Sequence, residues 1–464
     1  MGKLSEKIDR AMEHYLLILL AMALVALTFI GIGNLRTVGM LGCVLCIAGI
    51  STRGTVKIDL RILLPMLLYV LLCAASTFAV GMGFAGSYMY SHAIYPVIYL
   101  VMAYLDQKDL LRLKRWCAIW AGMVAVMALA QFMYKALDGI GARLGAVLGN
   151  PNSLGSFLVV GWCALMSFQP EDEEQSFSAE LLRRLEPVIL ATLALTLSMG
   201  SFLALAVGML VMLVQKKRKE GWREGIRFGS RMLAKATLAV GTGILMYFTA
   251  RMTAIPWLCL PILACLIGLA VYWPLFERFL RQFPKFAVMM TVLGACVALA
   301  AVMIRPSATA TFVERLEMMR NGLGYILDKP LLGLGPGQWR LANMSDADKY
   351  FNTWHIHNVF IHIGVELGLP AMTALLLIVF RRWQKGGRNT AGLAAFLFHN
   401  LMDTSFFYVG ITSMTLASVG EPETEGSTIP PVVMKLLLAV FAVLYFLVCI
   451  DVLINTMGGG ANAF

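Results

Sequence analysis

A long series of apolar segments is the feature that most constrains how this chain can fold. Each segment has about 18–22 residues, which is long enough to cross roughly 30 Å of hydrocarbon as a helix. Because lipid offers no water to unpaired backbone groups, such a segment is expected to be helical. The alternating pattern typical of a membrane β-barrel is absent. The sequence therefore predicts an all-α, polytopic transmembrane helical bundle.

The composition supports this prediction. Hydrophobic residues make up 59% and charged residues 14% of the 464 residues, against about 45–50% and about 25% in soluble domains. The nine cysteines lie mostly inside apolar segments and are expected to be small core residues. The net charge of +11 is expected on cytoplasmic loops, so the lipid bilayer is a predicted partner and nucleic acid is not.

We expect about 12–14 spans, and the first of them is interpreted as an anchor and not as a cleaved signal. The predicted spans are residues 15–33, 37–50, 61–80, 87–105, 115–136, 153–168, 186–199, 201–215, 233–250, 256–275, 286–304, 357–380, 391–418 and 432–455. The chain then divides into N-terminal transmembrane helices (1–304), one long extracytoplasmic loop that contains short helices and the catalytic motif (305–356), and C-terminal transmembrane helices (357–464).

Basic residues cluster in alternate loops, which are therefore expected on the cytoplasmic side of the membrane. These loops are residues 53–61, 108–115, 216–235, 278–285 and 381–388. The intervening loops, including 135–152, 305–356 and 421–431, are expected outside. With these assignments both termini lie in the cytoplasm.

The loop of residues 305–356 is the longest polar stretch, and loops of that length are usually functional. Leu316, Met319, Leu323 and Ile326 form an apolar stripe that predicts a helix lying across the membrane face. Three cations accompany this helix, and three glycines follow it within five residues, where they allow a backbone that can approach a ligand closely. The cations are Arg315, Arg320 and Arg340, and the glycines are Gly333, Gly335 and Gly337.

Three of the six histidines lie close together near the predicted span 357–380. His355 precedes it, His357 and Asn358 are its first two residues, and His362 and Glu366 lie further along it. They could be interfacial polar residues, but ionisable groups at membrane depth favour a functional interpretation. His355 and His357 would point apart on a helix and have no clearly spaced third ligand, so no metal site is predicted. Asp346 and Asp348 could hold Mg²⁺ but are typical of a solvated loop.

Two further polar groups are candidates. In the first outer loop, Asn150 and Asn152 flank a proline, and Asn152 could cap the next helix, while Arg143 could be a headgroup anchor. Inside the predicted span 391–418, His399 and Asp403 are spaced i, i+4, so on a helix they would face the same way and could bond to each other.

As a set, these motifs resemble the signature region of the O-antigen ligase and polymerase superfamily. The resemblance covers an arginine opening the loop helix (Arg315), Pro330-Leu-Leu-Gly-Leu-Gly335, and His357-Asn with Glu366-Leu-Gly near the middle of the following helix. The segment Arg143 to Asn152 and the pair His399 and Asp403 also look like family features. One departure is Ser198-Met199-Gly200, where family members commonly read Ser-Arg-Gly.

The resemblance implies a metal-independent, inverting glycosyltransferase or ligase without a cofactor, acting on a polyprenyl-diphosphate-linked glycan in cell-envelope polysaccharide synthesis. Arg315 and Arg143 match family positions that would bind the departing diphosphate, and Arg320 and Arg340 are additional candidates. His357 is the matching candidate for a general base, with His355 as its local competitor. Supporting roles fall to Asn150, Asn152, Gly333, Gly335, Gly337, Asn358, Glu366, His399 and Asp403.

The resemblance further implies a multi-pass protein of the bacterial inner membrane with its site outside the cytoplasm. The acceptor could be a glycan, a lipid or a protein, so ligase and polymerase remain open, and an envelope-biosynthesis complex is a further candidate partner. One alternative is a polytopic transporter or lipid-linked glycan flippase, although the polar residues gather at one outer face and not near the midplane. Another is an inactive scaffold, which Met199 would suggest.

Overall fold

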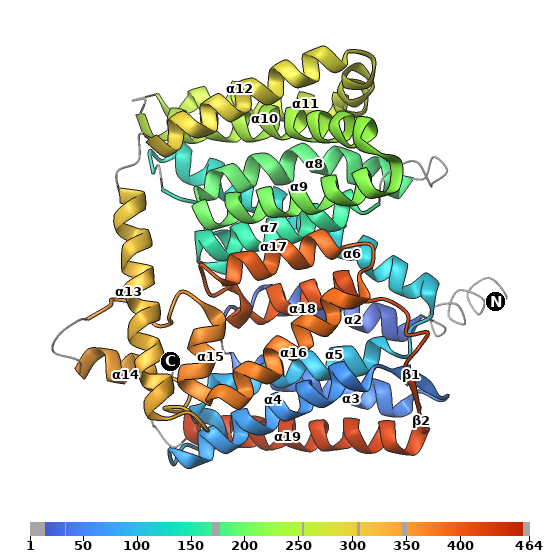
Figure 1. Ribbon diagram of the computed structural model, residues 1–464, viewed down its shortest axis with the longest axis vertical. Coiled ribbons are helices and arrows are strands. Elements are labelled where there is room, and N and C mark those ends of the chain that lie inside the picture. The colour runs from blue at the N-terminus through green and yellow to red at the C-terminus, as the bar shows by residue number, and fades with distance from the viewer. Residues whose placement is uncertain are drawn as a thin grey trace. The chain divides into compact units, whose positions relative to one another are not determined.

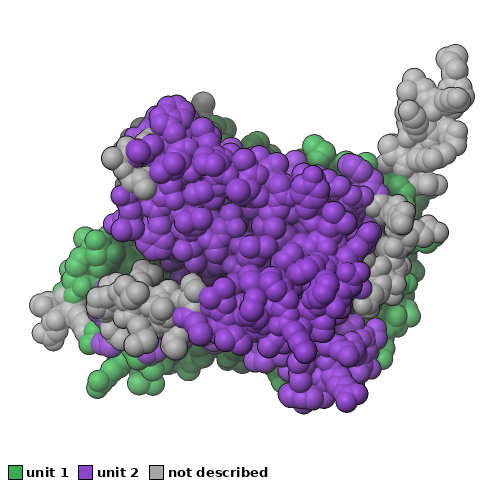
Figure 2. All heavy atoms as spheres, turned by 90° about the horizontal axis from the view of Figure 1, so that it is seen from above, with its two compact units in different colours: residues 1–114, 315–387, 403–464 green, residues 115–314, 388–402 purple. Residues whose placement is uncertain are grey.

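The computed structural model describes residues 14–457 except residues 33, 141, 169–176, 253–254, 304–306 and 346–349. Asp346 and Asp348 lie outside the described residues. The chain forms two compact units, coloured separately in Figure 2. Unit 1 comprises residues 1–114, 315–387 and 403–464, and unit 2 comprises residues 115–314 and 388–402.

Both units are built almost entirely of helices (Figure 1). The elements of unit 1 are α2 (Tyr15–Thr28), α3 (Leu35–Ser51), β1 (Val56–Ile58), α4 (Leu60–Ala79), η1 (Phe84–Gly86), η2 (Tyr88–Ala93), α5 (Ile94–Met102), α14 (Gln338–Ser345), α15 (Val359–Leu367), α16 (Leu369–Lys385), η6 (Ser405–Phe407), α18 (Val409–Val419), β2 (Ser427–Ile429) and α19 (Pro431–Met457).

Unit 2 contains η3 (Ala146–Leu148), α7 (Pro151–Met166), α8 (Phe177–Thr196), α9 (Met199–Glu220), α10 (Trp222–Met252), η5 (Pro256–Leu258), α11 (Cys259–Gln282), α12 (Pro284–Met303) and α17 (Thr390–Asn400). Two helices pass from one unit to the other. They are α6 (Gln107–Leu137), which begins in unit 1, and α13 (Ser307–Asp328), which begins in unit 2.

The helices confirm the all-α polytopic membrane fold. Within the described residues, six helices are long and apolar enough to cross a membrane, and five shorter apolar helices of 10–17 residues accompany them. The six are α4, α6, α9, α10, α11 and α19. All fourteen predicted spans coincide with helices, but two of them are broken.

The first break divides the predicted span 357–380 into α15 and α16. Gly368 joins the two helices with φ +86°, a conformation that favours glycine, and Pro370 follows at the start of α16. A Cβ at Gly368 would lie 2.3 Å from the Leu331 carbonyl oxygen, so the loop after α13 packs directly against this joint. The second break replaces the predicted span 391–418 by α17 and α18, with residues 401–408 between them.

Close helix packing in unit 1 depends on small residues. Gly39, Gly42 and Gly49 of α3 face α19, and a Cβ at Gly42 would lie 2.3 Å from the Tyr445 ring. Small side chains let two helices approach closely in a membrane, where no hydrophobic force drives their association. Gly49 faces Leu438 and Gly39 faces Cys449, so α3 and α19 run antiparallel.

One end of unit 1, here called the basic end, gathers residues 53–61, 106–114, 381–387 and 419–431. β1 pairs antiparallel with β2, placing Lys57 opposite Thr428. Lys114 Nζ lies 2.5 Å from Glu421 Oε1, and Lys385 pairs with Glu423. The predicted position of the loop 421–431, on the side opposite to the basic loops, is therefore wrong. The reason is the second helix break, because α17 and α18 together replace one predicted span.

The two described ends of the chain lie at opposite ends of unit 1. His14 Nδ1 is 2.9 Å from Asp109 Oδ2, at the basic end. The far end of α19 lies beside the turn that follows α4, since a Cβ at Gly83 would be 3.1 Å from Asp451 Oδ2. The prediction that both termini face the cytoplasm does not fit this arrangement, because α19 runs away from the basic end.

Asp59 is the central carboxylate of the basic end. It caps α4 and accepts a 2.7 Å hydrogen bond from Arg381 Nε, and Lys385 Nζ lies 3.0 Å away. Burial tends to raise the pKa of Asp59, but the hydrogen bonds from Arg381 and Lys385 outweigh it and hold the pKa well below its usual range. The charged form is therefore the one that the folded protein stabilises.

Asp59→Asn is expected to destabilise the protein by about 2–3 kcal/mol, because two cations lose their carboxylate. In the wild type a lowered pKa means that this stabilisation is complete at neutral pH and is lost as the pH falls below about 4. Thermal unfolding in detergent across pH should show the two proteins converging in acid. Glu425→Gln, which removes an exposed acid nearby, is the matched control. A difference that stays constant with pH would contradict this account.

A buried ion pair joins three helices of unit 2. Lys235 Nζ of α10 lies 2.7 Å from Glu186 Oε2 of α8, and the Trp273 Nε1 of α11 donates to the same oxygen at 2.8 Å. Both charged side chains are almost completely buried. A buried pair is stable only as a pair, since removing one partner leaves an uncompensated charge.

Lys235→Met is therefore expected to destabilise unit 2 by about 3–5 kcal/mol, whereas the double variant Lys235→Met/Glu186→Leu should recover most of that loss. Denaturant titration in detergent, followed by tryptophan fluorescence, would measure both variants. Additive losses in the double variant would show that the pair does not interact as described.

α13 runs across the direction of α4, α16 and α19 in Figure 1. Its buried face is Met318, Gly322 and Ile326. Of the predicted apolar stripe, Met319 and Ile326 pack in this core, whereas Leu316 and Leu323 are exposed. The placement of the helix across the membrane face stays a prediction. A Cβ at Gly322 would lie 2.7 Å from Ile356 Cδ1, so α13 packs closely against the segment that carries His357. This contact helps to position the candidate site.

Candidate active site

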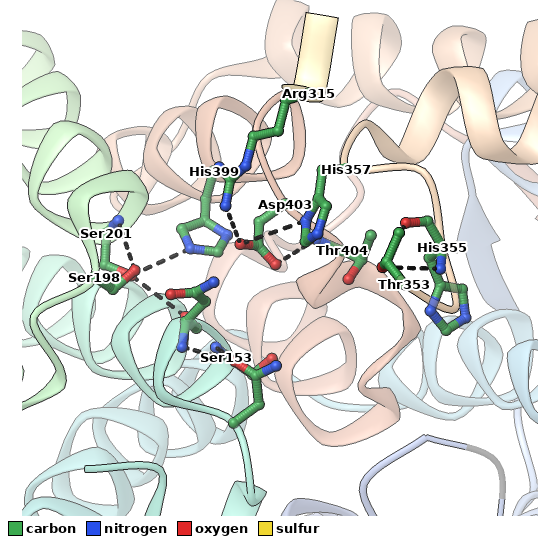
Figure 3. A network of polar contacts seen from close by, with 12 residues as sticks. Ser153, Ser198, Ser201, Arg315, Thr353, His355, His357, His399, Asp403 and Thr404 are labelled. Carbon is green, nitrogen blue, oxygen red and sulfur yellow. Dashed lines mark hydrogen bonds and ion pairs between the residues drawn. The ribbon is translucent and has the colours of Figure 1, made fainter. Parts of the chain in front are cut away.

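The structure brings Arg315, His357 and Asp403 together. Arg315 Nη2 lies 3.5 Å from Asp403 Oδ2, and His357 Nδ1 lies 3.9 Å from the same oxygen. Figure 3 shows the Arg315 and His357 side chains pointing toward the Asp403 carboxylate. Asp403 is 4% exposed, whereas Arg315 and His357 are 18% and 25% exposed. A buried carboxylate thus lies behind a cation and an imidazole that solvent or a ligand can reach.

The second helix break puts Asp403 in this position. α17 ends at Asn400, so Asp403 does not continue the helical face that carries His399. The helix on which the predicted i, i+4 spacing depends therefore ends before Asp403. The Asp403 Oδ1 accepts a 2.8 Å hydrogen bond from its neighbour's backbone, Thr404 N, which fixes the carboxylate in the turn.

His357 lies on an irregular segment, residues 350–358, that side chains of α14 hold in place. Asn343 bonds Phe351 on both sides, donating to its carbonyl oxygen at 2.6 Å and accepting from its N–H at 3.0 Å. Arg340 donates to the Thr353 carbonyl oxygen at 2.8 Å and lies 4.8 Å over the Trp354 ring. Arg340 therefore stabilises the segment that carries His357, which differs from its predicted role of binding diphosphate.

A buried network supports the same segment from below. His362 Nδ1 accepts a hydrogen bond from Ile356 N at 3.3 Å, so the proton of the neutral ring is assigned to Nε2. Nε2 lies 3.2 Å from the Tyr88 hydroxyl, which donates to Glu366 Oε2 at 2.9 Å. Asn358 caps α15 by accepting from Ile361 N at 3.1 Å. Glu366 and Asn358 therefore help to hold residues 356 and 357 in place.

His355, the local competitor of His357, packs differently. Its ring stacks on Phe407 at 4.8 Å and meets His362 edge-on at 4.9 Å. Burial, together with the nearby His357, lowers the pKa of His355 to about 3. Figure 3 shows the His355 ring pointing away from Asp403. A ring that binds protons so weakly is a poor general base near neutral pH.

The glycine turn approaches protein backbone. Gly333, Gly335 and Gly337 have φ values of +67°, +105° and +73°. A Cβ at Gly333 would lie 2.4 Å from the Glu366 carbonyl carbon, and Gly335 N donates to Glu366 O at 3.0 Å. The turn therefore packs against the end of α15. These close contacts are made with protein backbone, whereas the prediction was a close approach to diphosphate or sugar.

Arg320 is exposed and lies five residues after Arg315 on α13, about 140° around the helix. Because of this angle, the two arginines point to different sides of the helix. Arg320 is thus separated from the group around Asp403, and only Arg315 of the three predicted loop cations contacts that carboxylate.

Unit 2 carries a second polar group. Arg143 donates from Nε to the Thr196 carbonyl oxygen at 2.9 Å and from Nη2 to Asn152 Oδ1 at 2.9 Å. Asn150 caps α7, accepting from Asn152 N at 2.8 Å and from Ser153 N at 3.3 Å. The predicted cap at Asn152 is therefore wrong by two residues, since Pro151 occupies the first helical position and Asn150 precedes it.

His399 belongs to this second group. The Ser201 hydroxyl lies 3.2 Å from His399 Nε2 and 2.8 Å from the Ser198 hydroxyl (Figure 3). Ser198 caps α9, and Met199 begins that helix. No site role was predicted for Ser198, Ser201 or Tyr88. The only signal for the two serines was their place beside Met199, in the tight turn between two short predicted spans.

Metal ligands are not concentrated in the part of the chain that the structure describes. No group of three or more His, Cys, Asp or Glu side chains there could hold a metal ion.

Arg315 on α13 and His357 before α15 share the buried carboxylate of Asp403, in a chain that has helices long and apolar enough to cross a membrane. Such an arrangement is typical of a membrane-protein site suited to anionic substrates. The model of a family described as O-antigen ligase matches residues 188–376, from α8 to α16. This match confirms the resemblance to the O-antigen ligase and polymerase superfamily over that part of the chain. It includes Arg315, the glycine turn, His357 and Glu366. No curated protein matches the chain.

Proposed function

We propose that this protein transfers a glycan from a polyprenyl-diphosphate carrier to a hydroxyl group on a lipid, glycan or protein acceptor. The observation that carries the proposal is the contact of both Arg315 and His357 with Asp403. The reaction breaks the bond between the anomeric carbon and the diphosphate and forms a bond from that carbon to the acceptor oxygen. It therefore needs a cation for the leaving diphosphate and a base for the hydroxyl proton.

Arg315 is the proposed partner of the leaving group. Negative charge increases on the diphosphate oxygens as the glycosidic bond breaks, and a guanidinium can bind two of them at once. A partly buried position strengthens this attraction, because less water screens it. Arg315 can supply this charge without a metal ion, and we propose a metal-independent reaction.

His357 is the proposed general base. Its Nδ1 faces Asp403, so the carboxylate favours the tautomer in which Nδ1 carries the proton and Nε2 carries the lone pair. Nε2 would take the acceptor proton, and Asp403 would stabilise the imidazolium that forms. The distance of 3.9 Å exceeds a hydrogen bond, and such contacts often shorten when substrate binds. Attack on the side opposite to the diphosphate would invert the anomeric carbon.

Arg143 is a second candidate cation. Its guanidinium is bonded to the Thr196 carbonyl oxygen, at the start of the turn that contains Met199. Where family members commonly carry an arginine in this turn, the present chain has Met199. We propose that Arg143 supplies the positive charge at this turn, so that the missing arginine does not remove the activity.

Positive charge assigns a direction to unit 1. Basic loops face the cytoplasm, so the basic end is expected inside and Asp403, at the opposite end of α18, outside. The inner membrane of a bacterium is the proposed location. In this orientation His14 lies on the cytoplasmic side, and the end of α19 lies outside.

The proposal is tested by transfer in vitro with a synthetic polyprenyl-diphosphate oligosaccharide as donor, an envelope extract as acceptor, and EDTA present throughout. Purified protein should release polyprenyl diphosphate and form a glycosylated acceptor, and the Arg315→Ala/His357→Ala double variant should do neither. Dependence on an added divalent cation would overturn metal independence. Movement of intact donor across vesicles, without cleavage, would favour the flippase alternative instead.

A further inference from the structure

The Phe407 ring links the two segments that carry the proposed catalytic groups. Phe407 is completely buried in η6, four residues after Asp403. Its ring stacks on His355 with 4.8 Å between centroids and 18° between planes, and His355 lies two residues before His357. The stack therefore joins the Asp403 turn to the His357 segment through side chains that lie outside the reacting atoms.

Other rings hold Phe407 in place. His92 lies nearly parallel to it at 5.6 Å, His362 meets it edge-on at 5.1 Å, and Tyr88 does so at 5.9 Å. His92 and Tyr88 come from η2, and His362 comes from α15. Aromatic pairs in these geometries each contribute about 0.5–1.5 kcal/mol beyond the area that they bury. Contacts with η2, with α15 and with the segment that carries His355 therefore hold the Phe407 ring in place. They also restrict the movement of the turn that carries Asp403, four residues earlier.

The distance between the His357 ring and the Asp403 carboxylate is long for a polar contact. His357 Nδ1 and Asp403 Oδ2 are 3.9 Å apart, a distance at which a small displacement changes the contact strongly. A catalytic geometry must usually be held within about 0.5 Å, and a displacement of about 1 Å can reduce a rate by about a hundredfold. The packing of the two segments must therefore supply the alignment that the polar contact itself does not.

Resting on the proposed function, we infer that Phe407 and His355 form an aromatic stack that positions Asp403 against His357. His355 acts in this stack as a flat ring and not as a proton acceptor. The hydrogen bonds of His355 with Thr353 involve its backbone. Phe407 and His355 are proposed as positioning residues, because Phe407 is completely buried and the His355 ring packs against it.

The inference distinguishes ring shape from proton chemistry at position 355. His355→Phe keeps a flat ring against Phe407 and removes both nitrogens, whereas His355→Leu removes the ring. Phe407→Leu removes the partner ring. The matched control is Phe132→Leu in α6, because Phe132 is also a buried phenylalanine but belongs to the core of unit 2.

Transfer should be measured per folded molecule, with donor saturation and a pH profile for each variant. Phe407→Leu and His355→Leu are expected to lower kcat by about 10–100-fold, with little change in KM for the donor. His355→Phe should stay within about threefold of the wild type, because its ring preserves the stack. Phe132→Leu can lower thermal stability, but its kcat per folded molecule should be unchanged.

The pH profile separates positioning from a general loss of stability. His357 is faced by Asp403, by Arg315 on α13 and by the uncharged His355. Of these, the carboxylate favours the imidazolium. If Phe407→Leu lets Asp403 move away, His357 remains neutral at lower pH and the acid limb of kcat moves down by about 0.5–1 pH unit.

The outcomes divide cleanly. Wild-type kcat and pH profile in Phe407→Leu, or loss of activity in His355→Phe equal to that in His355→Leu, would overturn the inference. His357→Ala is run in parallel. If His357→Ala is active, the proposed function itself fails. If it is inactive while Phe407→Leu behaves as the wild type, only the positioning role fails.

Discussion

Arg315→Ala is expected to reduce glycan transfer by about 10²–10³-fold while the protein still inserts and folds. The reason is that the departing diphosphate gains negative charge, and Arg315 is the proposed cation that neutralises it beside Asp403. Removing one preorganised donor that stabilises charge in the transition state typically lowers the rate by this factor. Arg315→Lys keeps the charge but not the two-pronged geometry, and it should recover only a small part of the activity.

The measurement is single-turnover release of polyprenyl diphosphate in detergent micelles, with folding followed by thermal unfolding. Lys329→Ala is the control, since it removes an exposed cation just beyond the end of α13. Arg320→Ala tests the geometry of the helix itself. An equal loss in Arg320→Ala would show that general positive charge on α13 matters, and the specific role of Arg315 would have to be abandoned.

The features of this fold that could be predicted from sequence are those written in local patterns. Apolar length predicted where helices lie, because each run must pair its own backbone groups in lipid. The resemblance to the O-antigen ligase and polymerase superfamily also singled out Arg315 and His357, which the structure brings to the same carboxylate although they lie 42 positions apart in the sequence. Their shared partner Asp403 was named, but for another contact.

The features that were missed depend on breaks within apolar runs. Residues 391–418 contain no charge except Asp403, so hydropathy alone joins α17 and α18 into one span. That single error moved the loop 421–431 and the end of α19 to the wrong side. The break before α16 had a readable signal in Gly368 and Pro370, since glycine permits φ +86° and proline cannot continue a helix.

Other missed features depend on tertiary contacts. Gly333 and Gly335 were predicted to let the backbone approach a ligand closely. The sequence shows that glycine permits a close contact, but it does not show which group makes that contact. The structure supplies the end of α15. Likewise, Arg340 has the charge for a diphosphate, but its position beside Thr353 and Trp354 assigns it to the loop. Long-range partners decided both roles.

His357→Gln is expected to reduce the rate of transfer by about 10²–10⁴-fold at saturating donor, with donor affinity nearly unchanged. A general base contributes a factor of this size, and glutamine keeps much of the shape of histidine without accepting a proton. Since only the neutral imidazole accepts a proton, wild-type activity should fall as the pH drops. In His357→Gln, the small residual activity should lose that dependence.

Asp403→Asn removes both proposed functions of the carboxylate. An amide cannot balance the Arg315 guanidinium or stabilise the His357 imidazolium, so transfer should fall and its acid limb should move to lower pH.

If His357→Gln kept the wild-type rate while His355→Phe abolished it, the base would be His355. The ring stack on Phe407 would then be the site of chemistry, and the contact of His357 with Asp403 would be structural.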